Sequence, residues 1–242
     1  LRTPLAGNLV PFSQENLSEK MQDSVTKRKI KISWELAMGT SYLTNTSAFL
    51  NHPAKDFYST SFHYYASVKI PLIQNHDRFG IHFGVGPNVK NFGLNKLLTI
   101  TNNKLTFSDV PSNSAIKAVN FQQLTVDFPL YLYYETKSGR RGYHLSVEWG
   151  GIFGIQASNK WTTYEVNNGI TTITSQQDIP NTKNLQFGSS VKCALVKHTK
   201  LISSGLFIQG TYYSTSTFKS DVKLPTNSYD IRIGIYVTLN KL

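Results

Sequence analysis

The sequence contains little charge for its length. Asp, Glu, Lys and Arg make up 16% of the 242 residues, whereas an average soluble domain has about 25%. It also lacks any apolar run of about 18 residues, so it contains no candidate transmembrane helix. A chain of this length can still form one large all-β domain. The shortage of charge argues against an ordinary soluble domain, and the missing apolar run excludes a helical membrane protein.

Residues that carry chemistry are also scarce. The single Cys193 excludes an internal disulfide and a cysteine zinc cluster. The six histidines show no metal-ligand spacing, and neither a nucleophile elbow nor a phosphate-binding glycine motif occurs. We therefore predict no cofactor, no metal site and no enzymatic activity. Ser61 and His63 come closest to a catalytic pair, and they would matter only if the protein modified membrane lipids.

What the sequence does contain is a repeated alternation of apolar and polar residues. In the segment 229–239, isoleucines at 231, 233 and 235 alternate with Arg232 and Gly234. A period of two predicts an extended strand with two unlike faces. Segments of about ten residues match the length with which a tilted strand crosses a bilayer. Eight segments show this pattern: residues 29–39, 61–70, 79–90, 123–135, 143–154, 185–195, 202–212 and 229–239.

The connections between these segments alternate in length. Two of the long connections contain β-ribbon sequence, around the turn signal Asn168-Gly169 and over residues 97–107. Strict alternation is typical of outer-membrane barrels, which have short periplasmic turns and long extracellular loops. The short connections lie near residues 74–78, 137–142 and 197–200, and the long ones span 42–56, 94–118, 156–183 and 214–227.

We therefore predict an all-β fold, an eight-stranded antiparallel up-and-down transmembrane β-barrel in the cell outer membrane, formed by residues 27–242. Residues 1–26 show no periodicity, and we interpret them as a periplasmic lead-in or linker. The apolar stripe contains no charged residue, as a lipid-facing surface and a soluble core both require. The opposite stripe is rich in Gly, Ser, Ala and Thr, which favours a crowded barrel interior. A soluble lipocalin-like ligand-binding barrel, with the apolar stripe inside, is the alternative.

Charged residues on the small-residue stripe need partners inside a filled barrel, because an isolated buried ion is very costly. Glu148 and Lys192 lie at similar depth on neighbouring predicted strands, and Glu35 can meet Arg232 where the first strand closes on the last. An eight-stranded barrel has little lumen, so we predict a structural network rather than a gated pore. The predicted interior ion-pair network comprises Glu35, Arg232, Glu148, Lys192, Asp127 and His63, the last two completing a polar layer.

The net charge of +11 does not indicate nucleic-acid binding, because the basic residues are scattered and match none of the usual nucleic-acid folds. Many fall at predicted periplasmic strand ends, where long cationic side chains can reach lipid phosphates. This predicted basic belt comprises Lys27, Arg28, Arg78, Lys137, Arg140, Arg141, Lys197 and Lys200. Aromatic residues near strand ends fit the interfacial girdles of such barrels: Phe121, Tyr134, Tyr143, Tyr212 and Tyr229.

Residues 121–134 and 143–154 carry a family resemblance. The first segment places Pro129 between Val-Asp-Phe and Leu-Tyr-Leu, and the second ends in glycines and aromatics. In both respects the chain resembles the PorT-like outer-membrane β-barrel family of Bacteroidota over about residues 29–242. Family members include a secretion-system component, accessory barrels, and envelope-spanning regulators whose barrel is tethered by a periplasmic linker. The resemblance implies a non-catalytic anchor, sensor or accessory subunit, with outer-membrane lipids around it and a protein partner at the external loops or the N-terminal segment.

Overall fold

The computed structural model describes residues 30–43, 59–73, 76–94, 96–101, 104–111, 114–139, 141–179, 182–199, 201–215 and 227–239. The predicted lead-in, residues 1–26, lies outside the described residues, as do Lys27, Arg28, Arg140 and Lys200 of the predicted basic belt. Nowhere in the described ranges is there a helix long and apolar enough to cross a membrane.

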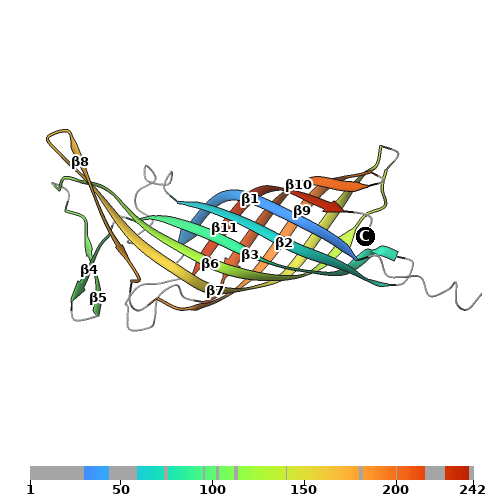
Figure 1. The fold of residues 1–242 in the computed structure, drawn as a ribbon, viewed down its shortest axis with the longest axis horizontal. Helices are drawn as coiled ribbons and strands as arrows, with labels where there is room; N and C mark the ends of the chain where they lie inside the picture. The colour runs from blue at the N-terminus through green and yellow to red at the C-terminus, as the bar shows by residue number, and fades with distance from the viewer. Residues whose placement is uncertain are drawn as a thin grey trace, which may run out of the picture.

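Eight antiparallel strands close into a barrel (Figure 1). They are β1 (Lys31–Leu43), β2 (Thr60–Ile73), β3 (His76–Leu94), β6 (Ile116–Glu135), β7 (Tyr143–Asn167), β9 (Leu185–His198), β10 (Ile202–Tyr213) and β11 (Ser228–Leu239). Strands adjacent along the barrel chain pair with each other, and β1 pairs with β11 to close the wall. The predicted eight-stranded up-and-down barrel is confirmed, and each predicted segment coincides with one of these strands.

The exposure of β11 distinguishes the two faces of the wall. Ile231, Ile233 and Ile235 are exposed, with 64% of Ile233 accessible, whereas Asp230 and Arg232 are buried. A soluble protein rarely exposes an apolar patch larger than a few hundred Å², and an apolar belt around a closed barrel is its lipid-facing surface. The chain is therefore a transmembrane β-barrel of the outer membrane, and the lipocalin-like alternative is wrong. The belt continues on the other strands through Trp34, Leu36, Met38, Phe62, Phe83, Val85, Leu130, Leu132, Leu145, Trp149, Val191, Leu195, Leu206 and Ile208.

Small inward residues make room for large ones in the barrel interior. Gly234 of β11 lies against the side chains of Phe207 and Ala37, and a Cβ atom at this position would collide with both. The missing side chain allows Phe207 to pack with Tyr236 and Ala37 inside the wall. The predicted crowding of the interior by the small-residue stripe is confirmed at this position.

Two β-ribbons extend the barrel beyond one end (Figure 1). β7 turns at Asn168 and Gly169, whose positive φ angles of 51° and 79° suit a tight hairpin, and it then pairs with β8 (Ile170–Gln177). β4 (Lys96–Thr101) pairs with β5 (Lys104–Asp109) in a separate hairpin. Both predicted ribbons are confirmed. The connection that contains β4 and β5 lies between Leu94 and Ile116, close to the predicted 94–118. The connection that contains β8 begins later than predicted, because β7 alone has 25 residues and continues well past the membrane.

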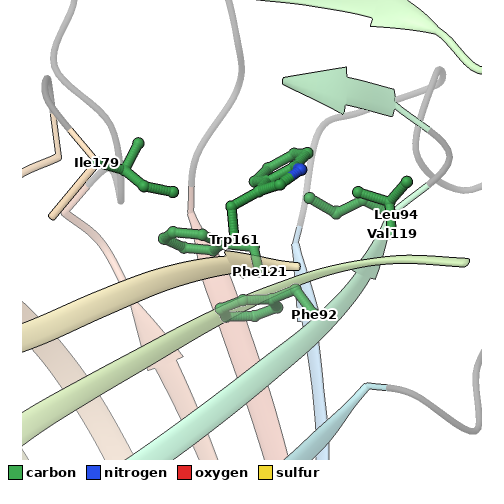
Figure 2. Packing of buried hydrophobic residues seen from close by; sticks show 6 residues of the cluster. All are labelled: Phe92, Leu94, Val119, Phe121, Trp161 and Ile179. Atoms are coloured by element: carbon green, nitrogen blue, oxygen red, sulfur yellow. The ribbon is translucent and has the colours of Figure 1, made fainter. Parts of the chain in front are cut away.

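A compact apolar cluster fills the base of this extracellular extension (Figure 2). Phe121 belongs to it and is 0% exposed, so its predicted place in an interfacial girdle is wrong. Phe121 shares the inward face of β6 with Gln123, and its ring packs near Phe92 and Trp161. Tyr134, Tyr143 and Tyr212 are exposed, as an interfacial position requires, and Tyr229 is half-buried. The cluster comprises Phe92, Leu94, Val119, Phe121, Trp161 and Ile179.

Candidate functional site

The periplasmic half of the barrel interior contains a compact salt-bridge network, called the lower network below. The register places Glu148 of β7 opposite Lys192 of β9, and the Nζ atom of Lys192 lies 2.6 Å from a carboxylate oxygen of Glu148. The same Nζ atom lies 2.6 Å from Glu35, while Lys69 Nζ lies 2.8 Å from the other oxygen of Glu148. His82 Nδ1 completes the group at 2.7 Å from Glu148. The structure thus brings together the predicted partners Glu148 and Lys192.

The predicted contact between Glu35 and Arg232 is wrong. Across the seam between β1 and β11, Glu35 faces Tyr236 and Arg232 faces Gly39. Gly39 is four residues beyond Glu35 along β1, a separation of about 13 Å in an extended strand. Glu35 therefore joins the lower network through Lys192, and Arg232 belongs to a second layer nearer the extracellular end.

Arg232 organises this second layer. Its guanidinium donates hydrogen bonds to Ser61 Oγ at 3.0 Å, to His63 Nδ1 at 3.0 Å and to Asn88 Oδ1 at 2.9 Å. It also forms a salt bridge with Asp230, its neighbour on the same face of β11. Charge-assisted bonds of this kind compensate for the cost of burying the guanidinium. His63, one of the two residues predicted for a polar layer, thus lies in the Arg232 layer.

Asp127, the other residue predicted for that layer, also lies here. Asn88 donates to its Oδ2 atom at 2.7 Å, and the Tyr65 hydroxyl donates to the same atom at 2.9 Å. Asn88 therefore connects Asp127 to Arg232. Nearer the extracellular end than Asn88, the Lys90 ammonium group donates a hydrogen bond to Gln186 at 3.0 Å and lies over the ring of Tyr213.

Sequence reasoning missed several members of the interior network. Lys69, His82 and Lys90 are all buried and all take part in it. Each lies on the small-residue stripe of its strand, so parity alone could have included them with Glu148. Their partners could not be read from parity, because Lys69 and Glu148 belong to strands that are not adjacent in the wall.

The arrangement of carboxylates raises the possibility of a metal centre. Ligand atoms of Glu35, His82 and Glu148 lie within 4.8 Å of one another. However, the ammonium group of Lys192 lies between the two carboxylates, 2.6 Å from each. It occupies the position that a cation would need, so the donor set fits an internal salt bridge better than a metal ion.

No hydrogen bond joins Ser61 to His63 in the described part of the chain. Both are buried, and both accept hydrogen bonds from the same Arg232 side chain. A serine nucleophile requires a base within hydrogen-bond reach of its hydroxyl. Here the Nδ1 atom of His63 accepts a hydrogen bond from the Arg232 guanidinium and is therefore not available to Ser61 as a base.

At the periplasmic mouth, the described members of the predicted basic belt lie at strand ends. Arg78, Lys137, Arg141 and Lys197 are all exposed, and their contact with lipid phosphates stays a prediction. Two of them, Arg78 and Lys137, also line a pocket of about 370 Å³ at the end of the lumen. The belt is therefore divided between residues that face this pocket and residues that do not.

No protein-family model matches the chain, and no curated protein matches it. Among solved structures, the chain is similar to Neisserial surface protein A, with 8% identity and a TM-score of 0.43 over 88% of this chain and 97% of that one. It is also similar to a major outer membrane protein from Thermus thermophilus, with 11% identity and a TM-score of 0.42 over 86% and 98% of the two chains. Ail of Yersinia pestis gives 7% identity and a TM-score of 0.37 over 86% and 97%. The strand register and the exposure of the apolar belt show the barrel independently of these likenesses.

Proposed function

We propose that the protein is a non-catalytic anchor of the outer membrane whose extracellular β8 edge binds a protein partner. The barrel would hold the chain in the membrane, and the ribbons would recognise the partner. Interior packing supports an anchor, because the networks around Lys192 and Arg232 fill the lumen with paired groups. The engagement of Ser61 and His63 by Arg232 supports a role without catalysis.

The observation that carries the proposal is the state of β8. All eight of its residues are exposed, and Ile170–Gln177 contains neither a charged residue nor proline. In the membrane, β7 pairs with β9 along one edge, and above the membrane β8 takes the place of β9 on that edge. Among the described strands, β8 is the last one in this part of the sheet. Its outer edge therefore presents backbone N–H and C=O groups that another strand can pair with.

An edge of this kind suits an extended partner segment. Natural edge strands are usually protected from pairing by lysine, by proline or by a bulge. β8 contains no lysine and no proline. Addition of a strand to an open edge supplies backbone hydrogen bonds, while side chains on alternate faces supply specificity. Ile170 and Ile173, both exposed, would provide apolar contacts on the two faces of the added strand. We infer that the partner contributes an extended, largely uncharged segment.

The resemblance to PorT-like barrels supports an accessory role in an envelope-spanning assembly. Residues 27–242 form the barrel domain in this proposal, and residues 1–26 form a periplasmic lead-in or linker. The position of Lys31 supports this division, because β1 begins at the periplasmic end of the wall. The chain would then have one attachment on each side of the membrane, the linker below and the β8 edge above.

A site-specific photocrosslink tests the β8 edge. A photoreactive amino acid at Thr172 of β8 is expected to crosslink a discrete protein in intact cells. The matched position is Thr106, an exposed threonine in β5 of the other ribbon. The Ile173→Lys substitution should abolish the crosslink, because a lysine on an edge strand opposes strand addition.

The result is informative in each direction. A crosslink from Thr172 that is absent from Thr106 and lost with Ile173→Lys supports the proposal. Equal crosslinking from both ribbons, or a crosslink unaffected by Ile173→Lys, would contradict an edge-specific site. A crosslink to a second copy of the chain would identify the partner as the protein itself.

A further inference from the structure

The pocket at the periplasmic mouth is built from the ends of five strands. On each strand, the lining residue shares the inward face with the buried interior residues, so the pocket is the periplasmic end of the lumen. The turn after β6 adds Thr136, Lys137 and Ser138 to the lining. The strand residues are Lys31 of β1, Arg78 of β3, Glu135 of β6, His144 of β7 and His198 of β9.

The lining carries an excess of positive charge. Glu135, the one carboxylate among the described lining residues, already forms a salt bridge with Lys69 from deeper in the barrel, at 3.1 Å. Lys31, Arg78 and Lys137 form no salt bridge with a carboxylate in the described part of the chain. Three cations therefore face this pocket, and Glu135, the one acid among its described lining residues, is shared between Lys69 and His144. Such an arrangement attracts an anion.

His144 provides an independent indication of a ligand. It is only 8% exposed, yet neither of its ring nitrogens has a hydrogen-bond partner among the described residues. Its Nε2 atom makes an ion-pair contact with Glu135 at 3.6 Å, longer than a hydrogen bond, and its Nδ1 atom has no such contact among the described residues. Buried polar side chains nearly always have partners. The imidazole lines the pocket beside His198, with the ring centroids 6.3 Å apart, and it can donate to a group held there.

We propose that this pocket binds a phosphate group. A phosphate offers several acceptor oxygens, which match the fork of Arg78, the ammonium groups of Lys31 and Lys137, and a donor nitrogen of His144. The hydroxyl groups of Thr136 and Ser138 add neutral donors on the same side. The pocket volume of about 370 Å³ leaves room for part of the molecule that carries the phosphate. This carrier is either a lipid headgroup from the inner leaflet or a free phosphate compound of the periplasm.

The proposal does not depend on the β8 edge, which lies at the other end of the barrel. It also goes beyond a general attraction of basic residues to lipid, because it requires specific inward residues. Lys197 provides the matched control for this distinction. It precedes His198 on β9, is exposed, and extends over the ring of Tyr143 outside the pocket.

Calorimetric titration of the purified chain in an uncharged, phosphate-free detergent tests the site. The probes are inorganic phosphate and dihexanoyl phosphatidylglycerol, each added to the unaltered chain and to four variants. Arg78→Gln and His144→Phe should weaken binding by about tenfold or more, as expected for loss of one bond to a charged group. Lys31→Gln should act in the same direction, and Lys197→Gln should leave the affinity unchanged within about twofold. Mobility on an unheated gel verifies that each variant is folded.

Nitrogen-15 spectra of labelled histidine give a second readout that does not depend on affinity. The ring nitrogens of His144 should shift on addition of the bound probe in the unaltered chain and in Lys197→Gln. In Arg78→Gln the shift should be much smaller at a probe concentration near the dissociation constant of the unaltered chain. Failure of His144 to respond would overturn the proposal even if phosphate bound elsewhere.

The two probes separate the sources of the phosphate. Saturable binding of inorganic phosphate supports recognition of a free phosphate group, whereas binding of the lipid alone supports a headgroup site. Either result counts for the pocket if the variants behave as stated. Absence of saturable binding by both probes, or an equal loss in Lys197→Gln and Arg78→Gln, would overturn it.

Discussion

The inward face of β6 changes character along a single strand. In the membrane section, Gln123, Thr125 and Asp127 point into the barrel, and in the extracellular section Phe121 and Val119 occupy the same face. The outward face changes in the opposite direction. Phe128 and Leu130 are exposed in the membrane section, and Asn120 and Gln122 replace them above it.

This inversion shows that the solvent outside the wall determines whether polar or apolar side chains fill the interior. Where hydrocarbon surrounds the barrel, the apolar residues face outward, and polar residues remain for the interior, where they must pair with one another. Where water surrounds the extension, burial of apolar surface again provides the driving force. The cluster around Phe121 is thus a core of the kind found in soluble proteins, attached to a barrel whose interior is an ion-pair network.

The largest effect is expected in the membrane section. Lys192→Met removes the cation shared by Glu35 and Glu148, leaving two carboxylates without it. Breaking a buried pair in this way should lower the free energy of unfolding by about 3 to 5 kcal/mol. Urea unfolding of the protein in phospholipid vesicles measures the change. Lys197→Met, which removes an exposed lysine from the same strand, should cost far less, and equal losses would argue against an interior network.

In the extracellular section, Phe121→Ala should lower the stability of the extension by about 3 kcal/mol, through loss of contacts with Phe92 and Trp161 and the cavity left behind. The effect should be local, because the membrane section has its own network. Hydrogen exchange is expected to accelerate in β8 and remain slow in β10. Loss of the heat-dependent gel shift in this variant would mean that the two sections unfold together.

A matched pair of isoleucines compares the two media directly. Ile233 in the middle of β11 and Ile173 of β8 are 64% and 61% exposed, so they differ little in accessibility. Ile233→Lys should cost about 2 kcal/mol, because the new charge faces hydrocarbon. Ile173→Lys should change the free energy of unfolding by no more than about 0.5 kcal/mol, as usual for a water-facing site. Similar values for the two substitutions in vesicle unfolding would refute the assignment of β11 to the membrane.

Much of the barrel could be predicted from the sequence because a strand has a period of two. Parity alone assigned Ile233 to one face and Arg232 to the other, and the alternation of connection lengths distinguished the two ends. Glu148 and Lys192 could be paired because both lie near the middle of neighbouring strands. Local patterns of this kind require no knowledge of distant parts of the chain.

The remaining errors arose where distant segments determine the outcome. The register between β1 and β11 is not set by a turn, so the depth of Glu35 relative to Arg232 could not be read from the sequence. Phe121 has inward parity, but only the length of β7 shows that the wall continues into water at that level. Likewise, the contact of Lys69 with Glu148 crosses the lumen between strands that do not pair.

The seam between β1 and β11 also constrains assembly. It joins the two ends of the barrel chain through twelve facing residue pairs, from Ile32 with Leu239 to Leu43 with Ser228. Until β11 is in place, β1 and β10 each have a row of unpaired backbone N–H and C=O groups. Such groups are energetically very costly in hydrocarbon, where no water can pair with them. A seven-stranded piece therefore has no stable state in the bilayer, and β11 is required for the membrane-embedded form of the chain.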